Sequence, residues 1–394
     1  MRKIDYDRAV VNHGNTEKIQ SVLRRAEAGA DLTIAFLGGS ITQGSLASTP
    51  QLCYAYRVYE WWQQTFPKAH FKYLNAGIGA TDSQFGCARV QEDVLEHFPD
   101  FVLLEYAVND AANAHYRETF EGVVRRILQA DSSPALMIMY NVCYDSGSSA
   151  ELFHAQVVRH YDLPAVSMRS TIYPELLAGR IRNEEITPDN LHPNDAGHEL
   201  VASVITCGLE QIRAEMDRGA AEGTDAKADS KRQSTAAVLP GFCPPLLPAP
   251  LTENAYEDSV RFRNMNAYTV ACEGFTPDPQ KQEHITEIFR CGWTAKEKGS
   301  RIVFRVEGSC IGVQYRKTIQ LPAPVAEVIL DGDAEHAQIL NANFDETWGD
   351  KLVLDTILDH GEPGEHFVEI RLKETHPDDR LPFYLVSVIA SGRD

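Results

Sequence analysis

The segment LTIAFLGGS, from Leu32 to Ser40, sets the fold expected for the first half of the chain. Its apolar run has the length of a buried strand, and the glycines that follow allow a sharp turn before Ser40. Four similar runs follow, separated by helical patterns: FKYLNAGIG (Phe71 to Gly79), FVLLEYAVND (Phe101 to Asp110), ALMIMYNVC (Ala135 to Cys143) and LPAVSM (Leu163 to Met168). Alternating strands and helices predict a three-layer α/β/α domain with a mostly parallel sheet.

The composition changes after the last predicted helix, which runs from Asn194 to Met216. The stretch from Arg218 to Val238 is small and polar, which is typical of a linker, and the proline-rich PGFCPPLLPAP after it excludes a helix interior. Six short alternating segments occupy the remainder: RIVFRVEG, CIGVQYRK, AEVILDGD, KLVLDTIL, EHFVEIRLK and FYLVSVIA. They predict an antiparallel, jelly-roll-like β-sandwich. The expected divisions are therefore 1–217 for the α/β domain, 218–239 for the linker and 240–394 for the sandwich.

The charge balance excludes several classes of function. The 394 residues include 37 Lys and Arg against 56 Asp and Glu, a formal net charge of −19. Such a surface argues against binding to nucleic acid or to anionic membrane, since both need a basic face. No apolar run reaches the roughly 18 residues that a membrane-spanning helix needs. The N-terminal segment is charged where a signal peptide would be apolar, so we expect a cytoplasmic protein.

The eight cysteines are scattered, without a CxxC pair or a tight Cys/His cluster. We therefore expect free thiols, several of them buried, and neither a disulfide framework nor a zinc site. The histidines show no metal-ligand spacing, so no metal is predicted.

Four short polar segments each end a predicted strand or precede a predicted helix. They are GGSIT with Ser40, NAGIGAT with Gly79, VND with Asn109, and DNLHP with Asp189 and His192. Open α/β sheets build their sites at the carboxyl ends of the strands, where these segments are expected to meet.

The residue types suit acyl transfer. A serine hydroxyl becomes a nucleophile when a histidine takes its proton, and an acid on the other ring nitrogen fixes the tautomer. His192 would be the base and Asp189, three residues earlier, the acid. The oxyanion that forms needs preorganised donors, which the N–H groups of Ser40 and Gly79 and the Asn109 amide could supply.

This set of blocks resembles the SGNH (GDSL-like) hydrolase family, whose four named residues would be Ser40, Gly79, Asn109 and His192. The resemblance covers roughly the first 215 residues. The spelling GGSIT in place of GDS is similar to the branch rich in carbohydrate esterases, and Ala107 stands where the third block usually has glycine. A sandwich after the hydrolase domain resembles the carbohydrate-binding modules of two-domain mannan acetylesterases.

The resemblance implies a cofactor-independent esterase that removes O-acetyl groups from carbohydrate, most directly acetylated manno-oligosaccharides. Two other functions fit the same sequence. An acyltransferase would use the same triad with a hydroxyl in place of water, and a glycan-binding protein would carry a silent hydrolase fold. The glycan-binding alternative is disfavoured because Ser40, Asp189 and His192 are all present.

Several residues have competing interpretations. Ser40 alone could cap a helix and Asn109 alone could be a turn residue, but the block context favours catalytic roles. His198 and Glu105 are expected to be structural, and Asp110 does not fit the acid's DxxH spacing. In the sandwich, Trp348 lies in the polar segment FDETWGDKL and is either a packing residue or a platform for a sugar ring. Trp293 and Tyr315 are expected to pack in or beside the core.

Overall fold

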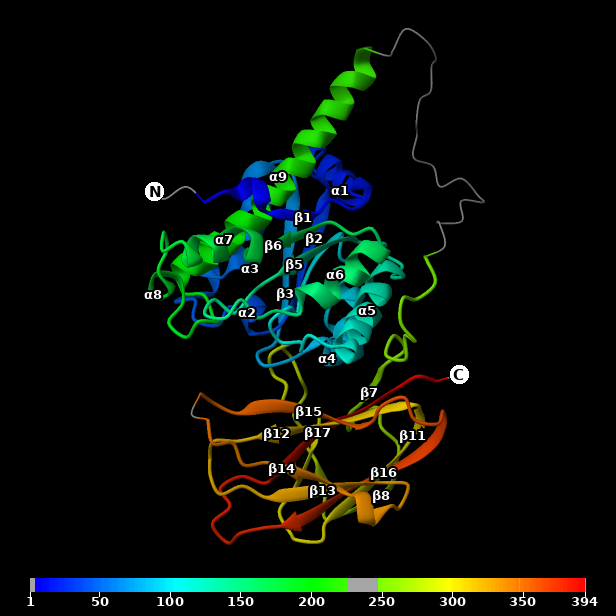
Figure 1. Ribbon diagram of the computed structural model, residues 1–394. Helices are drawn as coiled ribbons and strands as arrows, with labels where there is room; N and C mark the ends of the chain where they lie inside the picture. The colour runs from blue at the N-terminus through cyan, green and yellow to red at the C-terminus, as the bar shows by residue number, and fades with distance from the viewer. Residues whose placement is uncertain (1–3, 226–246, 347, 394) are drawn as a thin grey trace, which may run out of the picture.

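The first domain is a six-stranded sheet between two layers of helices (Figure 1). The sequence predicts these layers and five of the six strands, but not the short strand at Val10–Asn12. The computed structural model describes residues 4–225, 247–346 and 348–393. The strand order is β1-β6-β5-β4-β2-β3; β1 runs antiparallel to β6 and the remaining pairs are parallel. The strands span Val10–Asn12 (β1), Asp31–Gly38 (β2), His70–Gly77 (β3), Phe101–Glu105 (β4), Ala135–Tyr140 (β5) and Ala165–Ser167 (β6).

The helices divide between the two faces of this sheet. They are α1 (Glu17–Glu27), α2 (Ser40–Gln43), α3 (Tyr54–Thr65), α4 (Ser83–Asp93), α5 (Ala114–Leu128), α6 (Glu151–His160), α7 (Met168–Leu177), α8 (Asn183–Ile186) and α9 (Asp195–Asp225). Along β2, Ile34 and Phe36 pack with α1, α3, α7 and α9, whereas Ala35 and Leu37 pack with α4, α5 and α6. A strand buried on both faces has a continuous apolar sequence, which is why LTIAFLGGS predicts a buried strand.

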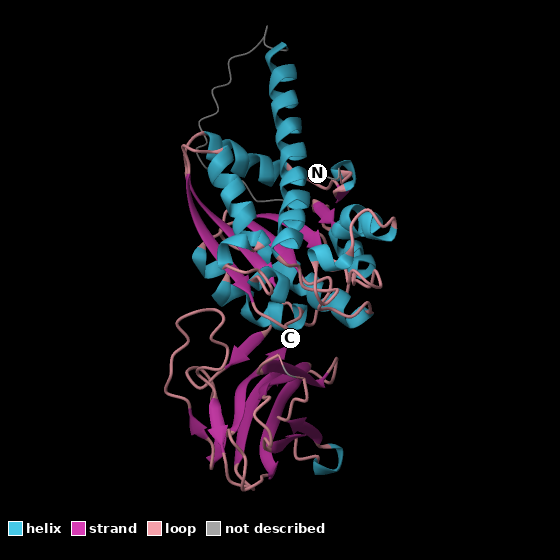
Figure 2. Cartoon of the chain, turned by 90° about the vertical axis from the view of Figure 1, so that its left-hand side faces the viewer, coloured by secondary structure: helices cyan, strands magenta, loops and turns pink. Residues whose placement is uncertain are grey.

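The second domain is a sandwich of two antiparallel sheets (Figure 2). One has the order β15-β12-β17-β10-β9, with β7 also pairing to β17, and the other has the order β14-β13-β16-β11-β8. The strands span Val260–Phe262 (β7), Thr269–Glu273 (β8), Thr276–Pro277 (β9), Trp293–Ala295 (β10), Arg301–Gly308 (β11), Cys310–Lys317 (β12), Val325–Leu330 (β13), Gln338–Asn341 (β14), Lys351–Leu358 (β15), Gly364–Glu374 (β16) and Phe383–Ser391 (β17). All six predicted segments form strands of this sandwich. The other five strands are short or lack a regular alternation of apolar and polar residues.

The expected linker begins too early. Helix α9 continues past Arg218 to Asp225, and 226–239 lies outside the described residues. The segment after residue 246 does not join the sandwich directly but runs along α5. The carboxylate of Glu121 accepts hydrogen bonds from the N–H groups of Leu251 and Thr252, and Glu118 accepts one from Ala255.

The domains meet at the carboxyl edge of the parallel sheet (Figure 1). Ile78 and Phe85, which follow β3, pack against Leu352, Tyr384 and Ile389 on the outer face of the sandwich. At the side of this contact, Arg263 of the sandwich pairs with Glu92 of α4 at 2.5 Å. The sandwich therefore lies beside the edge at which the sequence places its polar segments.

Two further expectations can be compared with the described residues. Seven of the eight cysteines are free thiols, as predicted, and Cys243 lies outside the described part of the chain. Among the helices that the structure describes, none combines the length and the apolarity required to cross a bilayer.

Candidate active site

Ser40, His192 and Asp189 form one chain of hydrogen bonds, although Ser40 and His192 are 152 positions apart. Ser40 Oγ lies 2.8 Å from His192 Nε2, and His192 Nδ1 lies 2.7 Å from Asp189 Oδ2. A carboxylate can only accept, so Nδ1 carries the proton and Nε2 is left to accept from Ser40. The structure thus brings together the three residues that the sequence predicts as nucleophile, base and acid.

Glycines allow Ser40 to take its position. Strand β2 ends at Gly38, Gly39 caps α2, and Ser40 is the first residue of that helix. A Cβ on Gly39 would lie 2.2 Å from Asn109 Oδ1, and a Cβ on Gly77 would lie 2.1 Å from the backbone nitrogen of Gln43. The overlap at position 77 is with backbone, so the close approach of α2 to β3 requires Gly77, whereas a side chain at position 39 would displace the Asn109 amide.

The loop that carries His192 is held from several sides. Asp189 Oδ1 accepts the N–H groups of Leu191 and His192, at 3.0 and 2.7 Å. Asn190 has a left-handed backbone with φ of 65°, and its carbonyl accepts the N–H of Tyr144 at 2.7 Å. Although partial burial opposes it, hydrogen bonding to His192 holds the pKa of Asp189 below its usual value. The acid is therefore charged at neutral pH and oriented before substrate arrives.

The three groups predicted as oxyanion donors lie on segments that are close to Ser40. The N–H of Ser40 belongs to the first turn of a helix, which leaves such groups unpaired. The Asn109 amide lies against Gly39, with its buried Oδ1 lacking a hydrogen-bond partner. A Cβ on Gly79 would lie 3.8 Å from Ser40 Cβ, which places that residue beside the nucleophile. The N–H of Gly79 already donates to Gln43 Oε1 at 2.7 Å, a contact that the sequence interpretation missed.

Buried polar residues brace the segments that carry these donors. Arg89 of α4 donates to the carbonyls of Gly38 and Ala76, near the ends of β2 and β3, at 3.0 and 2.8 Å. Asp110 accepts the Ser83 N–H at 2.9 Å and binds His154 Nε2 at 2.9 Å. It therefore ties the Asn109 turn to the start of α4 and is not the triad acid, as the spacing indicated.

Glu105 and His198 have structural environments, as expected. Glu105 is fully buried at the end of β4, and its Oε1 accepts the Ala107 N–H at 3.0 Å. Burial raises the pKa of the Glu105 carboxyl to about 8, so it is mainly neutral at pH 7. His198 accepts the Tyr54 N–H at Nδ1 and contacts the Ser45 carbonyl through Nε2, and burial lowers its pKa to about 4.

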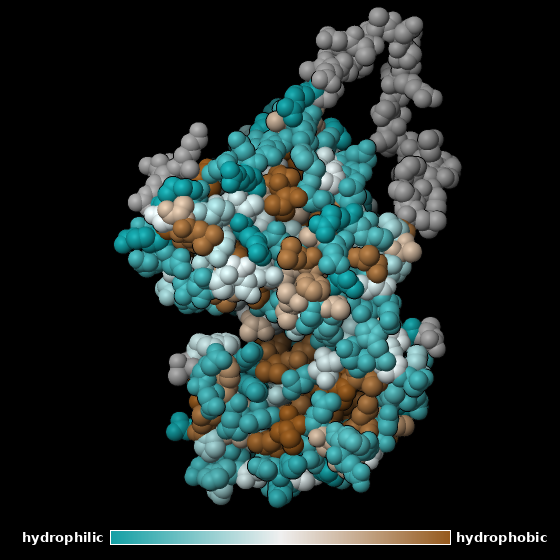
Figure 3. Space-filling view, viewed as in Figure 1, coloured by the Kyte–Doolittle hydropathy of each residue, from teal (hydrophilic) through white to brown (hydrophobic). Residues whose placement is uncertain are grey.

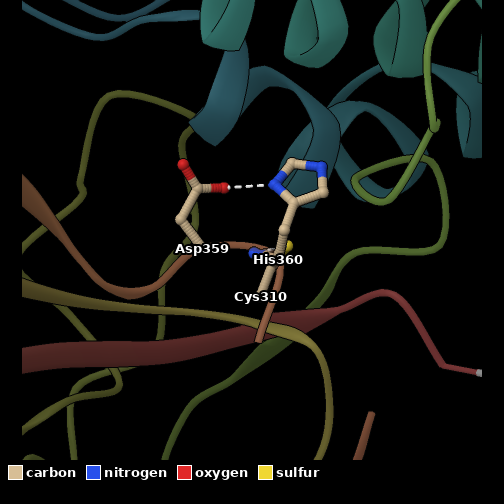
Figure 4. A group of neighbouring side chains, drawn as sticks. All are labelled: Cys310, Asp359 and His360. Carbon is tan, nitrogen blue, oxygen red and sulfur yellow. Dashed lines mark hydrogen bonds and ion pairs between the residues drawn. The ribbon is translucent and has the colours of Figure 1, made fainter. Parts of the chain in front are cut away.

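One group of side chains of the types that bind metals occurs within the described residues, and it lies apart from the triad. Cys310, Asp359 and His360 have potential ligand atoms within 4.8 Å of one another (Figure 4). Asp359 Oδ1 lies 2.7 Å from His360 Nδ1 and 2.6 Å from the Tyr256 hydroxyl, while His360 Nε2 lies 3.1 Å from Glu118. These mutual hydrogen bonds account for the arrangement, and we assign it no role in the reaction.

Trp348 is exposed in the loop before β15, with 57% of its surface accessible. Its ring packs edge-to-face on Phe344 at 5.1 Å between centroids, and its Nε1 donates to Glu346 at 2.6 Å. Trp293 and Tyr315 are instead buried in the sandwich core, as expected. Trp348 is therefore an oriented aromatic surface that other protein groups leave largely uncovered.

Comparison with known proteins finds the same two-domain arrangement elsewhere. Residues 36–200 match the GDSL-like lipase/acylhydrolase family. The whole chain is similar to the crystal structure of a two-domain esterase (CEX) active on acetylated mannans, co-crystallized with mannopentaose, with a TM-score of 0.91 and 53% identity over 100% of this chain and 99% of that one. A second structure of a two-domain esterase (CEX) active on acetylated mannans gives a TM-score of 0.90 and 54% identity over 100% of both chains.

A more distant likeness covers about half of the chain. Thioesterase 1/protease 1/lysophospholipase L1 of Escherichia coli (strain K12) is 26% identical over 201 residues, which are 48% of this chain and 89% of that protein.

Replacing Asn109 by alanine tests the oxyanion donors. We expect Asn109→Ala to lower kcat on an acetyl ester by about 10² to 10³ and to change KM far less, because the charged oxygen exists only after attack. Asn113→Ala is a matched control, since Asn113 caps α5 through its contact with the Tyr116 N–H. That change should cost about 1 kcal/mol of stability and leave kcat intact. An unchanged kcat in Asn109→Ala would place Asn109 outside the site.

Proposed function

The chain belongs to the GDSL-like lipase/acylhydrolase family, and we propose that it is a serine esterase that removes O-acetyl groups from acetylated manno-oligosaccharides. The proposal of ester hydrolysis by a serine nucleophile rests on the continuous hydrogen-bond chain from Asp189 through His192 to Ser40. The mannan substrate rests on the full-length likeness to esterases that act on acetylated mannans.

The geometry suits a two-step reaction. Ser40 Oγ attacks the acetyl carbonyl carbon while His192 Nε2 takes the hydroxyl proton, and the carbonyl oxygen becomes an oxyanion held by the surrounding donors. When the tetrahedral adduct collapses, His192 returns the proton to the departing sugar oxygen. Water then attacks the acetyl-serine, with His192 again as base, and acetate leaves. Asp189 stabilises the imidazolium at both stages.

The sandwich is proposed to bind the sugar chain and to leave the acetyl chemistry to the first domain. The surface is hollowed between the domains, on the side of the molecule where α2 and α8 lie (Figure 3). The start of β15 lies on that same side (Figure 1), and Trp348 precedes it with an exposed ring. An aromatic face beside such a hollow suits stacking against a sugar ring.

We also propose that the enzyme works in the cytoplasm, on oligosaccharides already taken into the cell. Seven cysteines are free thiols, four of them buried, which suits a reducing compartment. Fractionation of the source cells beside a cytoplasmic marker tests this, and recovery of the activity outside the cells would contradict it.

Replacing Ser40 by alanine tests the nucleophile. Ser40→Ala should reduce acetate release by several orders of magnitude with an unchanged unfolding temperature, because no other group in the triad can form the acyl-enzyme. Ser48→Ala is a suitable control, since the Ser48 hydroxyl contacts Asp195 and not the triad. Retention of more than about a tenth of the wild-type kcat in Ser40→Ala would refute the assignment.

Replacing Trp348 by alanine tests the sugar platform. We expect kcat/KM on acetylated manno-oligosaccharides to fall by an amount equivalent to about 1–3 kcal/mol, the usual effect of losing an aromatic anchor. Activity on p-nitrophenyl acetate, which has no sugar chain, should stay normal. Tyr268→Ala removes another exposed aromatic residue, beside β8 in the other sheet, and should change neither activity. Equal losses on both substrates would instead show that Trp348 supports the fold.

A further inference from the structure

Gln43 touches the oxyanion-hole region directly. It is the last residue of α2, three positions after Ser40, and therefore lies on the same side of that short helix as the nucleophile. Its Oε1 lies 2.7 Å from the Gly79 nitrogen, which is near the optimum for a hydrogen bond. A backbone N–H can only donate, so the atom facing Gly79 is the amide oxygen.

This contact engages the group that the proposed reaction needs. The Gly79 N–H has a single proton, and the acyl oxygen would need that proton as negative charge develops on it. The acyl oxygen therefore competes with Gln43 Oε1 for one donor. The Gln43 side chain is exposed, and among the described residues no hydrogen bond from its Nε2 fixes the amide on its other side. It can leave Gly79 by rotating toward solvent.

We propose that Gln43 is a displaceable cap on the oxyanion hole: its Oε1 occupies the Gly79 N–H in the free enzyme and gives way to the acyl oxygen during attack. This inference rests on the proposed esterase function. It makes Gln43 a residue that tunes the rate, because breaking its bond to Gly79 adds to the barrier for every acyl substrate. No covalent step involves the side chain.

A purely structural role for Gln43 makes a different prediction. The residue after Gly79, Ala80, has a left-handed backbone with φ of 56°, so the loop could depend on the Gln43 contact for its shape. In that case any side chain that keeps an acceptor would preserve activity, and any that lacks one would reduce it. Gln43→Ala and Gln43→Glu separate the two roles, because alanine removes the acceptor whereas glutamate keeps it and adds a negative charge.

The experiment measures kcat and KM on p-nitrophenyl acetate for the full-length wild type and both variants. If Gln43 is a cap, Gln43→Ala should raise kcat/KM by about 2- to 10-fold, which matches the modest net strength of one neutral hydrogen bond. Gln43→Glu should lower it by at least about tenfold, because a carboxylate at Gly79 holds the N–H more tightly and repels the oxyanion. The expected order is alanine above wild type above glutamate.

The opposite order would overturn the inference. If wild type and Gln43→Glu are similar and Gln43→Ala is slower, Gln43 supports the loop and does not cap the hole. Equal kcat/KM in all three proteins would show that the side chain is already away from Gly79 in solution. Thermal unfolding of each variant shows whether a loss reflects misfolding; if Gln43→Ala is unfolded, the comparison of Gln43→Glu with wild type still decides. Absence of activity in the wild type would reject the esterase function itself.

Discussion

The hydrogen bond between Ser40 and His192 is the constraint on which the site depends, because it joins residues 152 positions apart. Such a contact requires that the carboxyl end of β2 and the loop before α9 meet at one edge of the sheet. The parallel order β6-β5-β4-β2-β3 achieves this, because every crossover returns the chain to the same edge. The apolar strands and the flanking helices therefore determine the positions of the two short polar segments that carry Ser40 and His192.

Close packing at that edge explains the glycines in the first two motifs. Helix α2 lies so near β3 that any side chain at position 77 would strike the backbone of Gln43, and any at position 39 would strike Asn109. Arg89 then binds the carbonyls near both strand ends, so the nucleophile and Gly79 share one buried support. Removing an acceptor from a buried guanidinium is costly, which keeps these segments in register.

The hydrogen-bond chain of Ser40, His192 and Asp189 could be anticipated from sequence because the features that suggest it are local. A glycine turn after an apolar strand, and an acid three residues before a histidine, are visible in short windows around Ser40 and His192. The Gln43 contact was not predicted, although Gln43 directly follows the block that contains Ser40, because its partner Gly79 is in another segment. The short strands β7, β9 and β10 were also missed, because β7 and β10 pair with the distant β17 and β9 is only two residues long. The end of α9 was misplaced because its polar composition is as typical of a linker as of an exposed helix.

The position of the sandwich places it in direct contact with the segment that carries Gly79, the proposed oxyanion donor. Ile78 precedes Gly79 and Phe85 lies in the first turn of α4, and both pack against the outer face of the sandwich. Two guanidinium groups also lie near the Phe85 ring, that of Arg89 from its own domain at 5.4 Å and that of Arg261 from the sandwich at 5.0 Å from the ring centroid. Exposing two such side chains would cost about 1.5–3 kcal/mol each, so the isolated first domain would lose support where Gly79 must be held. The two domains therefore form one catalytic unit in physical terms, even though the triad residues all come from the first.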